Sequence, residues 1–283
     1  MIRRFHPHVL ALALFATAGL RAQIQDDDLY EPKDVTMEQV RGNATAFKNV
    51  HIRFTCQFHG IGAVHNPFFT RFTRADFANF AVWGDNQKIW NEGEYQNPLP
   101  GLFVAKIGRD ETLKTIYQLQ RYQRIEVTGI VRNVFLDEPW IEVFSVTPVA
   151  NKVSIPTLTH MHKAVDYMAQ RKWALAGSEL NQAMTSELPT FYQGWIHAYM
   201  GECFMRLGKA DNARTQLSYA MDFLPNELSV AQNLQTVTHN PKAGIDTMED
   251  AGKGIPKNLE PVWVAVEEPR SAPRGSSSAG PGR

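Results

Sequence analysis

Few residues in this chain have the types and the spacing that catalysis or metal binding requires. His160 and His162 form a His-x-His pair, but without a nearby cysteine or carboxylate partner the pair favours a solvated helix start over a metal site. Asp137 and Glu138 precede a proline and indicate a polar turn, because nothing around them suggests the burial that separates the pKa values of a catalytic pair. The sequence also lacks a nucleophile elbow, a phosphate-binding loop and a zinc-binding helix. We therefore expect a non-enzymatic protein with no cofactor and no metal.

The residues best suited to bind a small ligand lie between positions 67 and 95. Aromatic residues are frequent there, and Arg71, Arg74, Trp83 and Trp90 combine positive charge with flat rings. Such a surface stacks on bases or sugars and attracts anions, so it predicts a glycan, a small anion or an oligonucleotide as ligand. The alternative, and the more common outcome, is that these aromatic residues complete the core of a small domain.

Alternating segments surround this region and predict a small β domain. The clearest runs from His51 to Phe58, where every second residue is apolar, as in a half-buried strand. Similar segments occupy residues 77–83, 103–107, 124–131 and 140–149. Residues 110–119 have the spacing of a helix and lie between the third and fourth of these segments. The order is therefore three strands, a helix and two strands.

This order resembles the OB-fold, a five-stranded barrel with a helix between its third and fourth strands. The resemblance covers residues 48–150, with Gly129 where a barrel must bend or bulge. An SH3-like or other small barrel is the alternative. Within the preceding segment, residues 23–47, the stretch from Val35 to Phe47 predicts a short helix packed on the barrel.

Small residues recur at helical spacing between positions 195 and 225. Gly201 and Ala213 mark a close approach of two antiparallel helices, and Gly208 ends the first of them. The same pattern occurs upstream, each pair of positions being separated by 37 residues. The aligned residues are Ala164 with Gly201, Tyr167 with Phe204, Ala176 with Ala213, Leu180 with Leu217 and Ala183 with Ala220. Arg171 stands in the first copy where the second has Gly208.

This pattern resembles the tetratricopeptide repeat, an array of helical hairpins. The resemblance predicts an all-α domain over residues 155–240 and, with the barrel, an α+β protein of two domains. Each repeat buries its apolar face only against neighbours, and about three are normally needed for stability. We expect a cap from a short helix between Asn226 and Thr238, from the preceding domain, or from a second copy of the protein.

The tetratricopeptide resemblance implies that the first helix of each hairpin lines a groove that binds a protein or peptide. The groove residues would be Leu158, Met161, Val165 and Met168 from the first hairpin and Trp195, Glu202, Met205 and Arg206 from the second. We therefore expect a scaffold that holds a partner of unknown identity, with a hydrophobic helix or an extended segment as the best fit. A homo-oligomer through the repeats is a further option. The alternative is that the barrel domain covers residues 158–168 within the same chain.

The beginning of the chain predicts export. Arg3 and Arg4 precede an apolar stretch from Val9 to Leu20, which is typical of a signal peptide over residues 1–22. The alternative is a membrane anchor, but the stretch is shorter than the roughly 18 residues that span a bilayer. We expect no transmembrane segment and a mature protein that is soluble in the periplasm of the bacterial envelope or outside the cell.

The two cysteines and the net charge limit the kinds of function that the sequence allows. Cys56 and Cys203 fall in different predicted domains among core-forming residues, which favours buried free thiols, although a disulfide stays open. The 29 basic and 29 acidic residues give a net charge of zero. Nucleic acid binding normally needs a basic face, so nucleic acid is not an expected partner.

The end of the chain changes composition. Residues 241–283 are rich in proline, glycine and serine and predict a disordered tail. Within it the apolar segment from Val262 to Val266 is a hypothetical docking strand, either for a barrel edge or for the repeat groove.

Overall fold

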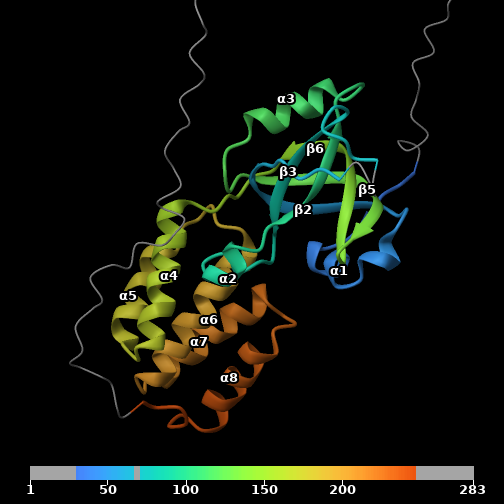
Figure 1. Ribbon diagram of the computed structural model, residues 1–283. Helices are drawn as coiled ribbons and strands as arrows, with labels where there is room; N and C mark the ends of the chain where they lie inside the picture. Colours follow the sequence, from blue (N-terminus) through green and yellow to red (C-terminus); the bar gives the residue numbers. More distant parts are fainter. Residues whose placement is uncertain (1–29, 67–70, 247–283) are drawn as a thin grey trace, which may run out of the picture. The chain divides into compact units, whose positions relative to one another are not determined.

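The computed structural model describes residues 30–66 and 71–246. Within these ranges, barrel strands β2–β6 are followed by five helices, α4–α8 (Figure 1). This order confirms the predicted α+β fold class of a small barrel followed by helices. The predicted signal peptide and the hypothetical docking strand lie outside the described residues.

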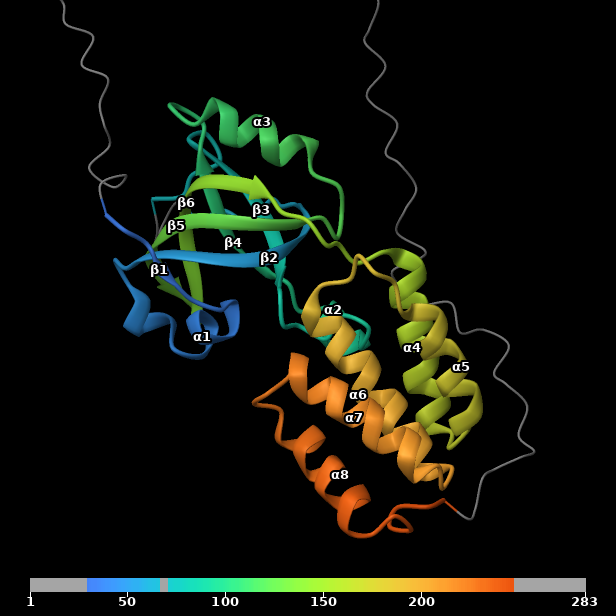
Figure 2. The same cartoon turned by 180° about the vertical axis from the view of Figure 1, so that it is seen from behind.

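The five strands close into a barrel of mixed direction. They are β2 (His51–Ile61), β3 (Phe77–Gly84), β4 (Leu99–Ala105), β5 (Arg124–Phe135) and β6 (Glu138–Pro148). β2 pairs with β3 and β5, β3 with β4, and β6 with β5, all antiparallel, while β4 and β6 pair in parallel (Figure 2). Helix α3 (Asp110–Gln118) follows β4, as predicted.

Two sequence patterns explain the barrel. Ile52, Phe54 and Cys56 alternate into its core, as period two requires. Gly129 sits at a register shift between β5 and β6, where a Cβ atom would lie 2.4 Å from the Glu142 carbonyl oxygen. Only glycine fits so close an approach, so the predicted bend is confirmed at this residue.

Two expectations for the strands need correction. β4 begins at Leu99 rather than at residue 103, because Pro100 and Gly101 belong to the strand although their types are typical of turns. Gln57 falls on the polar side of the alternation in β2, yet it is fully buried and its Nε2 donates to the Tyr192 hydroxyl at 2.8 Å. A contact 135 residues away therefore overrides the local pattern.

The N-terminal elements pack on the barrel. β1 (Lys33–Asp34) adds a short parallel partner to β2 and is followed by α1 (Met37–Gly42) and the 3₁₀ helix η2 (Ala44–Phe47). A capping box formed by Thr36 and Gln39 starts α1, which inserts Met37 into the barrel core. The helix predicted between residues 35 and 47 is thus present as two short pieces.

The C-terminal half consists of paired helices. They are α4 (Ile155–Ala169), α5 (Trp173–Ala183), α6 (Thr190–Arg206), α7 (Ala210–Phe223) and α8 (Leu228–His239). α4 packs with α5 and α6 with α7 as hairpins, and α8 packs on α7 at the place predicted for a capping helix (Figure 1). The small residues lie where the pattern places them, with Ala176, Ala213 and Ala220 fully buried.

In each of the two hairpins, the turn between the helices contains a residue with a left-handed backbone conformation. Gly208 has φ +72°, as expected for a helix end. Arg171, at the matching position of the first hairpin, has φ +58°, a conformation that costs a non-glycine residue about 1 kcal/mol. Its guanidinium forms an ion pair with Asp246, whose side chain is only 4 % exposed. Residues 241–246, assigned to the tail by composition, thus include an anchored end.

Both cysteines are buried and free. Burial raises the pKa of Cys203 to about 12 and that of Cys56 well above its usual range. The favoured interpretation, that they act as small apolar residues, agrees with these positions.

His59, at the end of β2, is the histidine whose pKa shifts most clearly among the described residues. Burial, together with the neighbouring Arg121 guanidinium, lowers its pKa from 6.5 to about 4. Since the folded-state pKa lies below the unfolded one, the unfolded state binds the proton more tightly between these values. The stabilising effect of neutral His59 is therefore fully present above pH 6.5 and is lost as the pH falls towards 4.

We expect His59→Gln to remove this pH dependence. Allowing for partial exposure of the ring, the loss of stability between pH 7 and pH 4 attributable to His59 should be about 1 to 2 kcal/mol. Urea unfolding at both pH values measures it. The exposed His239→Gln variant is the control and should keep the wild-type difference. An equal difference in all three proteins would contradict the assignment.

Candidate functional site

One face of α6 carries a row of aromatic and charged side chains. Trp195, Tyr199, Glu202 and Arg206 are spaced four, three and four residues apart, which places them on one side of a helix. We call this row the α6 face. Trp195 is nearly buried, whereas the Glu202 and Arg206 side chains are 27 % and 36 % exposed and form an ion pair at 3.4 Å. The face thus changes from apolar to charged along the helix.

The connection after β3 covers the apolar end of the α6 face. The Trp90 ring lies 6.5 Å from Trp195 and 6.4 Å from Tyr199, and its Nε1 donates to the Tyr199 hydroxyl at 3.4 Å. The Lys88 Nζ lies 3.5 Å from the centre of the Trp195 ring, a close cation–π contact. The remaining, charged part of the α6 face stays partly exposed.

Lys88 is an unusual cation in this setting. Burial lowers its pKa, while Glu227, Glu94 and Glu38 act in the opposite direction. Within the described part of the chain its Nζ makes no hydrogen bond to an acceptor. Because three carboxylates act on this one ammonium, its electrostatic surroundings favour a neutral or positively charged group over an anion.

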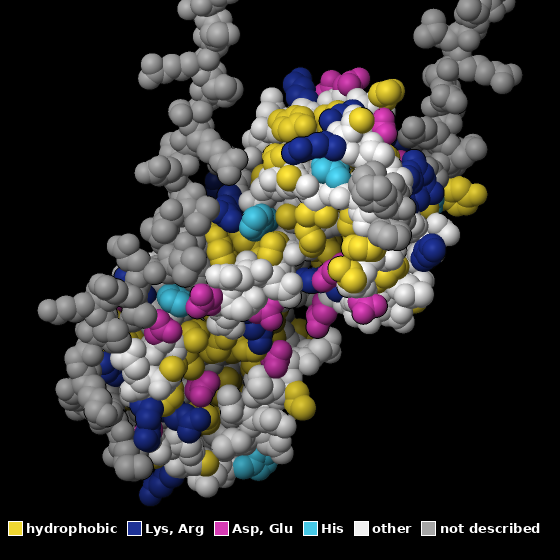
Figure 3. Space-filling model, viewed as in Figure 1, with side chains coloured by type: hydrophobic (Ala, Val, Ile, Leu, Met, Phe, Trp, Pro, Cys, Tyr) yellow, Lys and Arg dark blue, Asp and Glu magenta, His cyan; other side chains and the backbone are white. Residues whose placement is uncertain are grey.

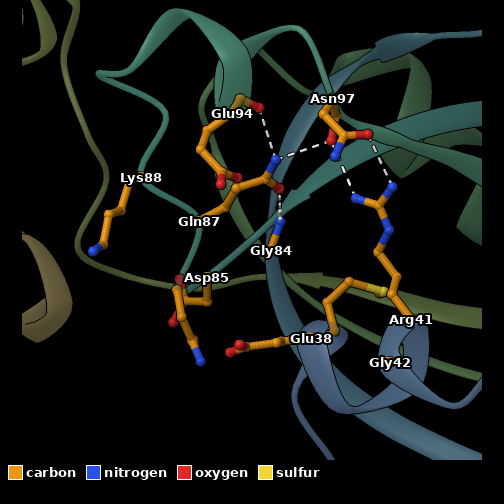
Figure 4. A pocket seen from close by; sticks show the side chains of 11 residues that line it. Glu38, Arg41, Gly42, Gly84, Asp85, Gln87, Lys88, Glu94 and Asn97 are labelled. Carbon is orange, nitrogen blue, oxygen red and sulfur yellow. Dashed lines mark hydrogen bonds between the residues drawn. The ribbon is translucent and has the colours of Figure 1, made fainter. Parts of the chain in front are cut away.

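A pocket of about 570 Å³ adjoins Lys88 (Figure 4). Residues of α1, of the connection after β3 and of the end of α2 (Glu92–Tyr95) line it. Gln87 holds this connection in shape, since its side chain accepts from the Gly84 N–H and donates to the carbonyls of Glu94 and Asn97 at 2.7 and 2.9 Å. These hydrogen bonds therefore fix the shape of this pocket wall without a bound ligand.

Two of the charges in this pocket are neutralised by partners. Arg41 forms an ion pair with Glu138 and also donates to Asn97. Asp85 accepts two hydrogen bonds from Arg124 at 2.8 and 2.6 Å. The side chains of Glu38, Glu94 and Lys88 remain, which agrees with a pocket for a polar or basic side chain.

The structure separates the predicted groove residues into two groups. Leu158, Met161, Trp195 and Met205 are buried within the helical core, so they support the fold. Val165, Met168, Glu202 and Arg206 are partly exposed. Burial of the first group agrees with the alternative that part of the expected groove is covered within the same chain, here by a core that also includes Trp83 and Trp90.

The residues of the predicted ligand platform are not brought together. Trp83 and Trp90 are completely buried in the core, as the more common interpretation expects. Arg71 and Arg74 are exposed, and Arg71 lies 3.3 Å from the carboxylate of Glu142. Phe72 stacks on Phe103 at 4.2 Å and belongs to a small separate core.

The described residues contain no group of three or more metal-ligating side chains. His160 and His162 do not start a solvated helix end; they are partly buried, and His160 Nδ1 lies 2.7 Å from Glu179 Oε2. Among the same residues, no helix has the length and the apolar character needed to cross a membrane.

Comparison of the chain with family models, curated proteins and solved structures finds no match.

Sequence reasoning missed Lys88, Tyr199 and Glu227. Lys88 and Trp90 flank one apolar residue just after a strand, which is a weak signal for a loop that packs on another element. Glu227 immediately precedes α8 and shows no local sign of its proximity to Lys88. Long-range contacts of this kind have no signature in one sequence.

Proposed function

We propose that this chain is an exported, non-catalytic adaptor that binds a protein partner through the partly exposed side chains of its paired helices. The observation that carries the proposal is the α6 face, where an apolar end in contact with Lys88 and Trp90 continues into the partly exposed pair Glu202 and Arg206. Figure 3 shows a strip of hydrophobic side chains over the helical region with acidic side chains along its border. Surfaces of this composition are typical of interfaces.

Two resemblances support the proposal. The paired helices and their small residues resemble tetratricopeptide repeats, which bind polypeptides along the first helices of their hairpins. The strand order of the barrel resembles an OB-fold, which here would act as a scaffold for the loop carrying Lys88 and Trp90. Export rests on the signal peptide predicted for residues 1–22.

The charges suggest the chemistry of the partner. Glu38, Glu94 and Glu227 act electrostatically on Lys88, three negative charges on one positive charge. A partner segment with apolar side chains and at least one basic side chain would complement both the hydrophobic and the acidic side chains of this surface. A second copy of the chain is the other occupant to be tested.

Variants at two partly exposed positions test this proposal. We expect Glu202→Lys combined with Met168→Glu to reduce recovery of the partner from the producing cells at least about 10-fold, since charge reversal opposes the complementary side chain. Quantitative affinity capture with the purified tagged chain measures recovery, and circular dichroism verifies the fold.

Leu175→Glu is the matched control. Leu175 is 43 % exposed on α5, the second helix of the first hairpin, so its change should leave recovery unaltered. Equal recovery with the double variant and the control would refute binding through this face. Recovery of only the chain itself, with a doubled mass in solution, would identify a homo-oligomer as the complex.

A further inference from the structure

A second site lies at Arg121, between α3 and β5. Its guanidinium carbon lies 5.5, 5.7 and 5.8 Å from the ring centres of Trp83, Tyr95 and Tyr122. The Trp83 and Tyr122 rings are stacked with 6° between their planes, and all three rings are buried. These rings hold the cation against a rigid aromatic wall.

No carboxylate among residues 30–66 and 71–246 forms an ion pair with Arg121. Its one hydrogen bond to a described side chain joins Nη2 and His59 Nε2 at 3.0 Å. Because the lowered pKa keeps His59 neutral at pH 7, this ring accepts the bond but supplies no negative charge. The Arg121 Nε is buried and has no hydrogen-bond partner among the described residues.

Several other arginines of the barrel have carboxylate partners. Arg41, Arg124 and Arg132 each form an ion pair with a carboxylate of the same chain. A buried polar group without a hydrogen-bond partner destabilises the folded state. A guanidinium whose Nε is buried without a partner, and which has no carboxylate partner among the described residues, is therefore a feature that calls for an external anion.

Arg121 lines a pocket of about 1400 Å³. The walls are formed by residues 118–123, by residues 149–155 and by Glu187. Amide and hydroxyl groups contribute the uncharged polar part of the lining, and they belong to Gln118, Gln120, Gln123, Asn151 and Ser154. Lys152 adds a second positive charge against the single carboxylate of Glu187, so the lining carries a net positive charge.

We propose that this pocket binds an oxyanion, the carboxylate or phosphate group of a small ligand, with Arg121 as its principal contact. A guanidinium whose face rests on aromatic rings directs its remaining N–H groups along its edge, which suits a two-point contact with two oxygens. Lys152 contributes a second, more exposed charge, and the surrounding amides donate to further oxygens. This site is separate from the α6 face and does not depend on the adaptor proposal.

Isothermal titration of the purified chain with inorganic phosphate and, separately, with citrate tests the proposal. We expect saturable binding of at least one of them, accompanied by a change in tryptophan fluorescence because Trp83 contacts Arg121. Stronger binding of phosphate or of citrate tells which oxyanion the pocket prefers. Arg121→Gln should weaken binding about 10- to 100-fold, the loss expected for hydrogen bonds from a charged donor.

Two further variants keep the test decisive. Lys152 is exposed, so Lys152→Gln should fold normally and weaken binding several-fold. Arg109→Gln removes a guanidinium that lies over the Phe144 ring outside the pocket and should bind like the wild type. The absence of saturable binding by the wild-type chain, or equal affinities of the Lys152 and Arg109 variants, would overturn the proposal even if Arg121→Gln did not fold.

Discussion

Gly201→Ala is expected to lower the free energy of unfolding by about 1 to 2 kcal/mol, although alanine is normally the better helix residue. A Cβ atom at position 201 would lie 2.5 Å from Leu217 Cγ and 2.8 Å from its Cδ2. Leu217 is fully buried and its backbone nitrogen is only 3.3 Å away, so α6 and α7 would have to separate. Chemical denaturation of the purified variant measures the loss.

Gly177→Ala provides the matched control for Gly201→Ala. It lies inside α5, and a Cβ atom there would meet nothing within 4 Å. The variant should raise stability by about 0.5 to 1 kcal/mol through helix propensity alone. In a Leu217→Ala background the Gly201→Ala penalty should also disappear, since the clashing atoms are gone. Gly201→Ala as stable as Gly177→Ala would contradict the close approach of α6 and α7.

Asp246→Ala is expected to destabilise the helical region by about 2 to 4 kcal/mol. The carboxylate is almost completely buried and accepts hydrogen bonds from Arg171 Nε at 2.6 Å and from Trp173 Nε1 at 2.9 Å. Without this carboxylate, the Trp173 Nε1–H and the Arg171 Nε–H would lose the acceptor that Asp246 provides. Arg171 would also keep its left-handed backbone without the ion pair to Asp246.

An exposed aspartate is the control for Asp246. The ion pair of Asp211 with Arg214 has a similar length, 2.9 Å, but the Asp211 side chain is 93 % exposed. Asp211→Ala should therefore change stability by less than about 0.5 kcal/mol. Thermal unfolding of the two variants compares them directly, and equal shifts in Tm would mean that Asp246 is no more than a surface contact.

Local patterns predicted much of the fold. The 37-residue repeat of small residues predicted the positions of the two hairpins. Glycine and alanine are small enough for two helices to approach closely, so their spacing indicates where the helices cross. Gly129 was predictable for the same reason. The beginning of β4 was not, since Pro100 and Gly101 have turn propensities that the pairing with β3 and β6 overrides.

The candidate sites were less predictable than the fold. Met168, Glu202 and Arg206 follow from helical spacing and remain partly exposed. Burial of Trp195 depends on Lys88, more than 100 residues earlier in the chain. Arg121 differs from Arg41, Arg124 and Arg132 in having no ion pair with a carboxylate among the described residues. Such differences arise from tertiary packing, and no spacing in the sequence reports them.

Photo-crosslinking in the producing cells tests the adaptor proposal most directly. A photoreactive phenylalanine analogue at position 202 lies on the α6 face, whereas the same analogue at position 175 lies on the exposed side of α5. The proposal predicts a crosslink to another polypeptide from position 202 and none from position 175. A crosslink from position 175 alone, or none from position 202 while the partner is still captured, would contradict it.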